Sequence, residues 1–124
     1  MLSINKATRR VESLNMGDSG YIVYRKVGKE LEEIFRSEDL VHDFNLPYQV
    51  GTRGDDPKKA HCDSHILYPG DIIVLATDGL WDNVQEEEIM KIVANKEKAN
   101  SDDLLNEIAA ELADVARRNA LNTY

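Results

Sequence analysis

The chain has 124 residues, a formal net charge of −8 at pH 7, 42% hydrophobic residues and one cysteine, Cys62. Its length and apolar content suit a single domain, its negative charge argues against nucleic acids and anionic membranes as partners, and no apolar run approaches the roughly 20 residues that span a bilayer. A lone cysteine forms no internal disulfide and no targeting segment is visible, so we expect an intracellular protein.

The first third of the sequence predicts β-strands. Residues Met1–Asn5 read as an initial strand, Arg10–Met16 alternate between apolar and polar side chains, and Tyr21–Val27 are rich in β-branched and aromatic residues. The turn Gly17–Gly20 joins the last two, and Glu30–Phe35 can supply a further strand.

The middle of the chain predicts a long loop followed by two strands. Residues Ser37–Ala60 have no sustained period and contain several prolines and glycines, which indicates an excursion over the surface. Residues Cys62–Tyr68 alternate again. Asp71–Ala76 is a continuous apolar run of the kind found in a strand buried on both faces.

The last third predicts helices. Asn83 is expected to cap the first one, with Glu86 in the capping-box position, and Ser101 is expected to cap a longer one. Apolar residues recur at helical spacing in both segments: Ile89, Ile92 and Val93 in the first, and Leu104, Leu105, Ile108, Leu112, Val115 and Ala116 in the second. Strands followed by two or three helices predict an α+β fold.

Two short motifs imitate a trypsin-like serine protease. Gly17–Gly20 has the sequence of its nucleophile loop, and Ala60-His61-Cys62 imitates the loop that carries its histidine. In such enzymes the histidine precedes the serine, whereas His61 follows Ser19, and the motif also lacks the Gly-x-Ser-x-Gly spacing of a nucleophile elbow. We therefore interpret Ser19 as part of a turn and exclude serine nucleophile chemistry.

Two aspartates follow the apolar run. Asp78 comes where the predicted strand ends, and one turn of helix would bring Asp82 back beside it. Two carboxylates held that close repel each other unless a cation or a proton intervenes, and a carboxylate on a rigid support suits a metal ligand. On these residues alone an ordinary Asp-Gly turn remains the simpler interpretation.

Two segments, Asn15–Gly20 and the more specific Asp71–Asn83, resemble signature segments of the PPM-type (type 2C) metal-dependent protein serine/threonine phosphatases. Between them, His42–Gln49 resembles the branch that includes mitochondrial and azacytidine-resistance-type members. The matching material runs from about Arg10 to about Val84.

The resemblance implies a β-sandwich flanked by helices with Mn²⁺ or Mg²⁺ at one edge. In the family the metals activate a water that attacks the phosphorus of phosphoserine or phosphothreonine in a phosphoprotein substrate. Asp78 matches a ligand of the core metal pair, and Asp18 and Asp82 match, with Asp78, the carboxylates of a further, weaker site. The implied location is cytoplasmic or mitochondrial.

The family pattern is incomplete in this sequence. The upstream Asp-Gly segment that bridges both metals is not matched, because Glu12 is the only acidic residue before Gly17, and no acidic pair follows the last helix. We therefore expect residues 1–124 to be a partial phosphatase domain, without a complete catalytic set and with little activity alone. A non-catalytic pseudophosphatase or interaction module is the alternative, and a structural domain with an incidental Ca²⁺ or Mg²⁺ site is a weaker one. We also expect Met1–Asn5 to be an exposed sheet edge that permits dimerisation.

Two other motifs carry weaker hypotheses. His61, Cys62, Asp63 and His65 could suggest a zinc site, but strand alternation would place Cys62 on the opposite face from the other three, and no second ligand pair exists. Arg53-Gly54-Asp55 matches an adhesion tripeptide, yet three residues recur by chance. We expect an ordinary strand and an ordinary loop.

Overall fold

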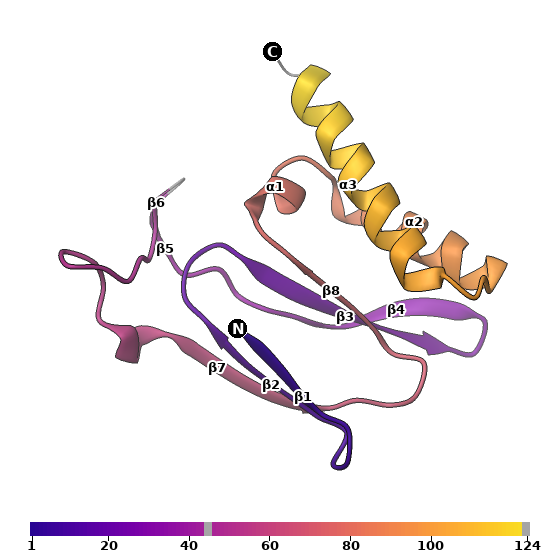
Figure 1. Ribbon diagram of the computed structural model, residues 1–124, viewed down its shortest axis with the longest axis horizontal. Helices are drawn as coiled ribbons and strands as arrows, with labels where there is room; N and C mark the ends of the chain where they lie inside the picture. Colours follow the sequence, from indigo (N-terminus) through magenta and orange to yellow (C-terminus); the bar gives the residue numbers. More distant parts are fainter. Residues whose placement is uncertain (44–45, 123–124) are drawn as a thin grey trace. The chain divides into compact units, whose positions relative to one another are not determined.

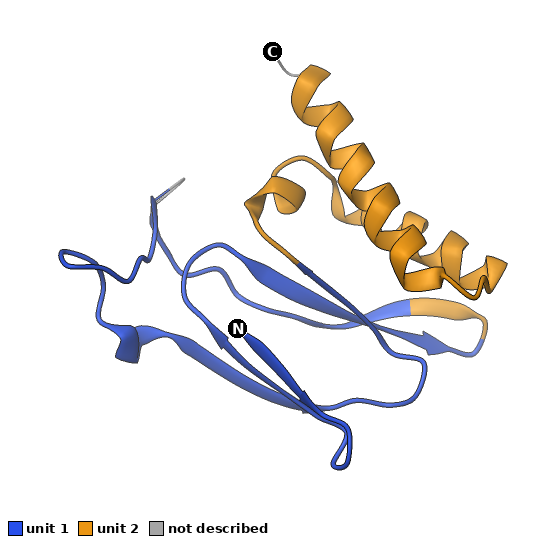
Figure 2. Cartoon of the chain, in the orientation of Figure 1, with its two compact units in different colours: residues 1–28, 32–75 blue, residues 29–31, 76–124 orange. Residues whose placement is uncertain are grey.

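The computed structural model describes residues 1–43 and 46–122 (Figure 1). The fold divides into two compact units, residues 1–28 with 32–75, and residues 29–31 with 76–124 (Figure 2). The first unit contains nearly all of the strands, and the second contains the α-helices.

One three-stranded sheet is antiparallel. Within the described residues its order is β1-β2-β7, formed by β1 (Leu2–Asn5), β2 (Arg10–Asn15) and β7 (His61–Ile66). The predicted alternation in β2 is confirmed, because Val11 and Ser13 are buried whereas their neighbours are exposed. This sheet therefore has one covered face and one open face.

A second three-stranded sheet has the order β4-β3-β8 among the described residues. It is formed by β3 (Gly20–Val27), β4 (Glu30–Arg36) and β8 (Ile72–Ala76). Central strand β3 supplies a run of buried side chains from Tyr21 to Tyr24. Since β2 and β3 belong to different sheets, the segment 16–19 passes from one sheet to the other instead of closing a hairpin.

The prediction that Asp71–Ala76 is buried on both faces is wrong. Ile72 and Val74 are buried, whereas Leu75 is 58% exposed. β8 lies at the edge of its sheet, and the described residues cover only one of its faces. A short apolar run does not by itself reveal how many faces are covered.

The loop predicted for residues 37–60 contains small elements. β5 (Val41–Asp43) pairs antiparallel with β6 (Leu46–Pro47), and a 3₁₀ turn, η1, covers Pro57–Lys59. Of the motif His42–Gln49, residues 44 and 45 lie outside the described residues. Hydrogen bonds organise the rest of the loop.

The described residues form three α-helices: α1 (Asp78–Trp81), α2 (Glu86–Ala99) and α3 (Leu104–Asn122). The two long helices bury the predicted apolar positions Ile89, Ile92, Val93, Ile108, Leu112, Val115 and Ala116. Leu105 is an exception and is exposed. A Lys96 to Glu111 ion pair of 3.3 Å links α2 to α3. None of the helices in the described part of the chain combines the length and apolar character that a membrane crossing requires.

The prediction that Asn83 caps the helix at residue 86 is wrong. Gln85 occupies the N-cap position of α2, and the Asn83 side-chain amide donates instead to the Gly79 carbonyl at 2.9 Å. The short helix α1 precedes α2, and the Asn83 side chain bonds to α1 instead of capping α2. Glu86 and the two glutamates after it nevertheless lie in the first turn of α2, where the helix dipole favours negative charge.

Candidate functional site

Asp78 and Asp82 occupy the two ends of one helical turn. α1 begins at Asp78, directly after β8, and the Asp82 N–H donates to the Asp78 carbonyl at 2.8 Å. Residues four apart in a helix lie on the same face, so both exposed aspartates share one face of the turn, as the sequence predicts. The Asp78 turn, residues 77–83, is therefore a compact support for two carboxylates.

Neighbouring residues hold the Asp78 turn in place. The indole Nε1–H of Trp81 donates to the Ala76 carbonyl at 3.0 Å, and Leu80 is buried. Trp81 is half-buried, so its ring contributes packing as well as this bond. Most of the bonds at residues 76–83 join residues no more than five apart. One longer bond, from the Asn119 side-chain amide of α3 to the Asn83 carbonyl at 2.8 Å, ties the end of the turn to α3.

Asp18 lies in a different kind of turn, in the other unit. The Asp18 turn, residues 17–20, begins at buried Gly17, whose φ of +111° lies outside the range that L side chains readily adopt. The Gly17 carbonyl accepts a hydrogen bond from Leu40 N–H at 2.8 Å, and the Asn15 side chain donates to the Glu38 carbonyl at 3.2 Å. Asp18 and Ser19 are half-buried.

The donor chemistry of these aspartates suits a hard divalent cation, because Mg²⁺ and Mn²⁺ prefer carboxylate oxygen. Asp78 and Asp82 supply two such side chains on one turn. Among the described residues, however, no group of three or more His, Cys, Asp or Glu side chains is placed to hold a metal ion. The described residues thus offer carboxylate donors of the right kind, but too few of them lie close together. We therefore assign no reaction step to a metal on this chain alone.

The residues of the zinc hypothesis lie on strand β7. His61, Asp63 and His65 are half-buried on one face, whereas Cys62 is exposed on the other, as alternation predicts. The His65 ring packs against Phe35 with centroids 3.9 Å apart, and its buried Nε2 has no hydrogen-bond partner among the described residues. These residues bring no metal-binding group of three together on β7 within the described part of the chain.

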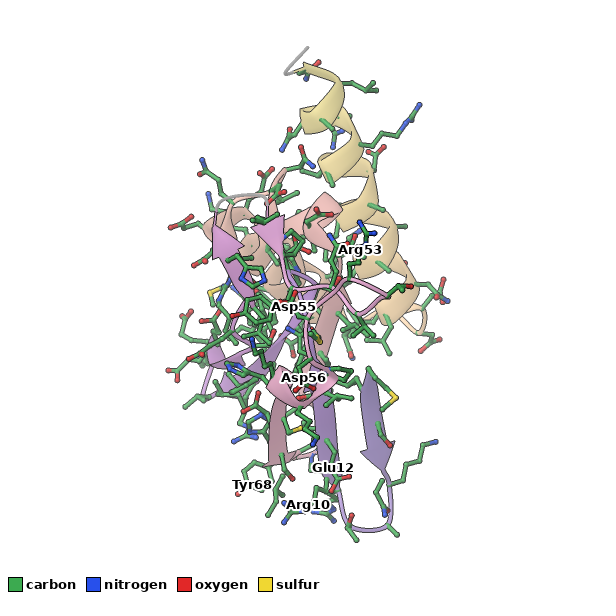
Figure 3. The ribbon with its side chains drawn as sticks, turned by 90° about the vertical axis from the view of Figure 1, so that its left-hand side faces the viewer. Arg10, Glu12, Arg53, Asp55, Asp56 and Tyr68 are labelled. Carbon is green, nitrogen blue, oxygen red and sulfur yellow. The ribbon has the colours of Figure 1, made fainter. Side chains whose placement is uncertain are left out.

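Asp55 of the Arg53-Gly54-Asp55 triplet is engaged within the protein. One carboxylate oxygen lies 2.7 Å from His42 Nε2, and the other accepts the Gln49 N–H at 2.9 Å. Figure 3 labels Arg53 and Asp55. The backbone N–H of Gln49, followed by the imidazole of His42, keeps the pKa of Asp55 below its ordinary value against the opposing effect of desolvation. This carboxylate is not presented for adhesion.

Sequence reasoning missed a partly buried ion pair between β3 and the residue that precedes β8. Arg25 donates through Nε and Nη2 to both oxygens of Asp71, each at 2.8 Å, and its guanidinium lies 4.1 Å from the ring centroid of Tyr68. Burial would raise the pKa of Asp71, but the bonds from Arg25 and from Tyr68 N–H outweigh it and lower that pKa. Arg25 and Asp71 are 46 residues apart, and no local pattern pairs them.

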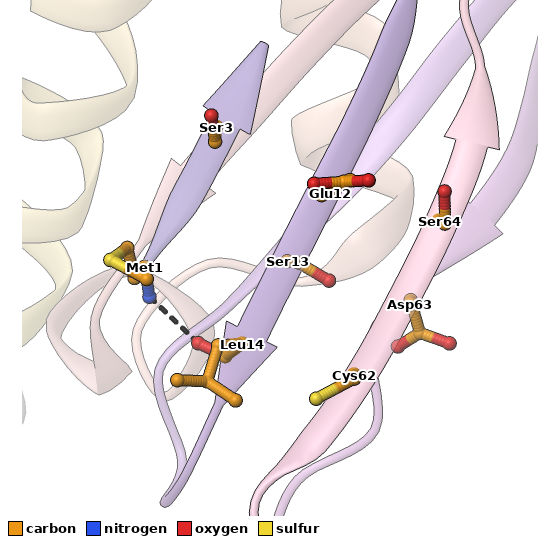
Figure 4. Close-up of a pocket in the computed structure, with 8 residues that line it drawn as sticks. All are labelled: Met1, Ser3, Glu12, Ser13, Leu14, Cys62, Asp63 and Ser64. Atoms are coloured by element: carbon orange, nitrogen blue, oxygen red, sulfur yellow. Dashed lines mark hydrogen bonds between the residues drawn. The ribbon is translucent and has the colours of Figure 1, made fainter.

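The sequence gives no signal for the shallow groove that crosses the sheet β1-β2-β7. Figure 4 shows the side chains that line it, and the Met1 ammonium donating to the Leu14 carbonyl at 2.8 Å. The lining residues are Met1, Ser3, Glu12, Ser13, Leu14, Cys62, Asp63 and Ser64. Polar and apolar side chains both line the groove. Among the described residues they do not form a group of three or more His, Cys, Asp or Glu side chains that could hold a metal ion.

Comparisons with curated sequences find phosphatases. A protein from Drosophila erecta, "Protein phosphatase PTC7 homolog fig", is 39% identical over 117 residues, which cover 87% of this chain and 35% of that protein. "Probable protein phosphatase 2C 55" of Arabidopsis thaliana is 38% identical over 112 residues, covering 89% of this chain and 23% of that protein. The chain thus spans about a third or less of the length of these relatives.

Solved structures and a family profile agree with these relatives. The photosystem II phosphatase PBCP matches with a TM-score of 0.77 and 28% identity, over 94% of this chain and 43% of that one. The Mycobacterium tuberculosis serine/threonine phosphatase PstP/Ppp shares the fold, with a TM-score of 0.64 and 20% identity, over 95% of this chain and 53% of that one. The Protein phosphatase 2C profile matches residues 60–123, more than half of the chain. This chain belongs to the protein phosphatase 2C family.

Proposed function

We propose that this chain forms part of a metal-dependent protein serine/threonine phosphatase domain and contributes Asp18, Asp78 and Asp82 to its metal-binding edge. The observation that carries the proposal is the Asp78 turn: two exposed carboxylates on one helical turn, within the segment that the phosphatase 2C profile matches. The substrate class is a phosphoprotein that carries phosphoserine or phosphothreonine. We further assign this chain to the branch of the family that includes mitochondrial and azacytidine-resistance-type members. We propose a cytoplasmic or mitochondrial location.

The cofactor of this proposal is Mn²⁺ or Mg²⁺, which when bound supplies a Lewis acid that makes water nucleophilic and neutralises phosphoryl charge. Asp78 and Asp82 would supply oxygen donors from a short helix fixed by the Trp81 indole. Asp18 would supply a further donor from the turn that follows β2. Since the described residues bring together fewer than three metal-binding side chains, we propose that residues 1–124 alone support little or no turnover.

A Mg²⁺ titration followed by amide resonances tests the metal-binding proposal. In the wild-type chain we expect saturable shifts at Asp18, Asp78 and Asp82, at millimolar metal because few carboxylates contribute. Asp78→Asn removes a charged donor at the proposed site and should abolish the shifts. Asp114→Asn is the matched control, because Asp114 is an exposed aspartate on α3 that pairs with Arg118, and this variant should respond like the wild type.

The same titration contradicts the proposal if resonances move equally in the wild type and in Asp78→Asn. Hydrolysis of a phosphothreonine peptide is measured in parallel with Mn²⁺ present. Sustained metal-dependent turnover by residues 1–124 would overturn the proposed lack of activity but would support the phosphatase assignment.

The second candidate function is a non-catalytic module that binds phosphoproteins or partner surfaces. The observation that favours it is the lack of a three-donor metal cluster among the described residues. Saturable binding of a phosphopeptide without added metal and without phosphate release would favour this module. Phosphopeptide binding that requires Mg²⁺ and is lost in Asp78→Asn would favour the phosphatase site.

We also propose that β1 is a site of self-association. In the described part of its sheet, β1 pairs with β2 alone, and Ile4 on this strand is exposed. An edge strand without charged side chains invites pairing with another strand. A sizing column run over a range of concentrations tests this, and a monomer at every concentration would exclude it.

A further inference from the structure

The loop after β4 packs directly on the Asp18 turn. Besides the bond from Leu40 N–H to the Gly17 carbonyl, the Tyr48 N–H donates to the Leu40 carbonyl at 2.9 Å. A Cβ atom at Gly17 would lie 3.2 Å from the Tyr48 carbonyl oxygen and 3.9 Å from Pro47 Cβ. The backbone of Tyr48 is therefore the surface against which the first residue of the Asp18 turn rests.

Three side chains fix that stretch of backbone, and we call them the loop clamp: His42, Tyr48 and Asp55. The imidazole of His42 stacks on the Tyr48 ring, with centroids 4.0 Å apart and planes 13° apart. The same imidazole meets the Asp55 carboxylate through Nε2 at 2.7 Å. Asp55 thus orients the imidazole of His42, and that imidazole packs against the Tyr48 ring.

Asp55 also ties the clamp to the main chain beside Tyr48. Its second carboxylate oxygen accepts the Gln49 N–H at 2.9 Å, and its own N–H donates to the Gln49 carbonyl at 2.6 Å. A Cβ at Gly54 would lie 2.2 Å from the Gln49 carbonyl oxygen, so the loop closes too tightly there for any other residue. Residues 49–55 consequently form a closed ring whose polar link to His42 runs through Asp55.

We propose that the loop clamp is a positioning device for the Asp18 turn, so that Asp55, His42 and Tyr48 set the orientation of a carboxylate they do not touch. The chain of contacts runs from Asp55 to His42, to the Tyr48 ring and backbone, and from there to Gly17, the residue before Asp18. The value of this device for metal binding rests on the proposed function. The mechanical coupling from the clamp to the turn does not.

The test compares the variant Asp55→Ala with the variant Asp56→Ala. Asp56→Ala is the matched control, because Asp56 belongs to the same loop and carries the same charge, but its carboxylate accepts the Lys58 N–H at 3.0 Å. Figure 3 labels Asp55 and Asp56. Without metal, Asp55→Ala should shift the amide resonances of residues 17–20 and speed their hydrogen exchange, and Asp56→Ala should leave them unchanged. Asp55→Asn, which keeps an oxygen acceptor, should restore most of the wild-type pattern.

The amides of β2 and β7 report whether the variant is folded. If Asp55→Ala fails to fold, His42→Gln provides the second test, because it removes the stack on Tyr48 and should also shift residues 17–20. Changes confined to residues 40–59, with residues 17–20 unmoved, would overturn the positioning proposal.

Addition of Mg²⁺ then separates the two proposals. A saturable response at Asp18 in the wild type that is lost in Asp55→Ala and kept in Asp56→Ala supports both. If Asp18 does not respond to Mg²⁺ in the wild type, the metal site of this chain fails, while the metal-free shifts still decide whether the clamp positions the turn.

Discussion

The two turns that carry the candidate aspartates are stabilised in different ways. The Asp78 turn is held mainly by bonds between residues no more than five apart, including the Trp81 indole to the Ala76 carbonyl, and by one bond from the Asn119 side chain to the Asn83 carbonyl at its end. The Asp18 turn is held by Leu40 and Tyr48, which follow Gly17 by more than twenty residues. The bonds of one turn are mainly local, with a single long-range bond at its end, whereas the other turn depends on a distant loop.

This difference indicates where each carboxylate is vulnerable. A change far along the chain can displace Asp18 without touching it, whereas the Asp78 turn should respond mainly to its own residues and to Asn119, which donates to the Asn83 carbonyl. Stability measured over the whole chain does not separate these cases, because a small local shift costs little free energy. Substitutions paired between the two turns do separate them.

The largest effect is expected at the ion pair that precedes the Asp78 turn. The side chain of Asp71 is 3% exposed and accepts two bonds from Arg25, and bonds to charged groups contribute about 2–3 kcal/mol when one partner is removed. Asp71→Ala should lower the free energy of unfolding by that amount in urea, followed by Trp81 fluorescence. If amides 77–83 keep their resonances in the folded variant, the Asp78 turn does not depend on this ion pair.

Acid titration provides the control for that prediction. The pKa of Asp71 lies below its ordinary value of 3.8 in the folded protein, so its stabilising contribution is present above pH 3.8 and is lost as the pH falls through the lowered pKa. Asp71→Asn should therefore flatten the fall in stability below about pH 4. Asp102→Asn, at an exposed aspartate, should leave it unchanged. Equal acid profiles for all three proteins would contradict the role of this pair.

The next largest effect is expected at Gly17. Alanine there would have to adopt a φ of +111° with its Cβ 3.2 Å from the Tyr48 carbonyl oxygen, and such a conformation costs about 2 kcal/mol. Gly17→Ala should destabilise the chain by that amount in urea and shift the amides of Tyr48 and Gln49, since coupling between turn and loop acts in both directions. Unchanged amide resonances of Tyr48 and Gln49 would show that the contact does not couple the Asp18 turn to the loop.

The same contrast explains what the sequence could predict. Alternation in β2, the apolar faces of α2 and α3 and the helical relation of Asp78 to Asp82 are local patterns, and each was recovered. The contact between Gly17 and Tyr48 joins residues from separate segments, and no periodicity reports it. The resemblance to a phosphatase family identified Asp18 as a candidate ligand, but it gave no indication of what holds that turn.

The errors of sequence interpretation have equally specific causes. Asn83 has the residue type of a helix cap, yet α1 ends beside it and the Asn83 side chain donates to the Gly79 carbonyl of α1. Gln85 is the N-cap instead, and α2 begins at Glu86. Leu75 belongs to an apolar run but lies on the open face of an edge strand. In both cases a correct local propensity was outweighed by the neighbouring element.

A smaller effect is expected at Trp81. Trp81→Phe keeps an aromatic ring but removes the hydrogen bond to the Ala76 carbonyl, which contributes about 1 kcal/mol. Circular dichroism in urea should detect that loss, and the amide shifts should be confined to residues 76–83. Shifts at residues 17–20 would contradict the independence of the two turns.

The smallest effect, and the only gain, is expected at Gly79. This glycine lies within α1, and a Cβ there would meet only the Thr77 hydroxyl at 3.5 Å, which is an ordinary contact. Alanine in a helix is favoured over glycine by about 0.5–1 kcal/mol, so Gly79→Ala should raise the free energy of unfolding, the opposite sign from Gly17→Ala. If Gly79→Ala instead destabilises the chain, the Asp78 turn must depend on a close approach at Gly79 outside its own residues, and the distinction between a turn with mainly local bonds and one supported by a distant loop would no longer hold.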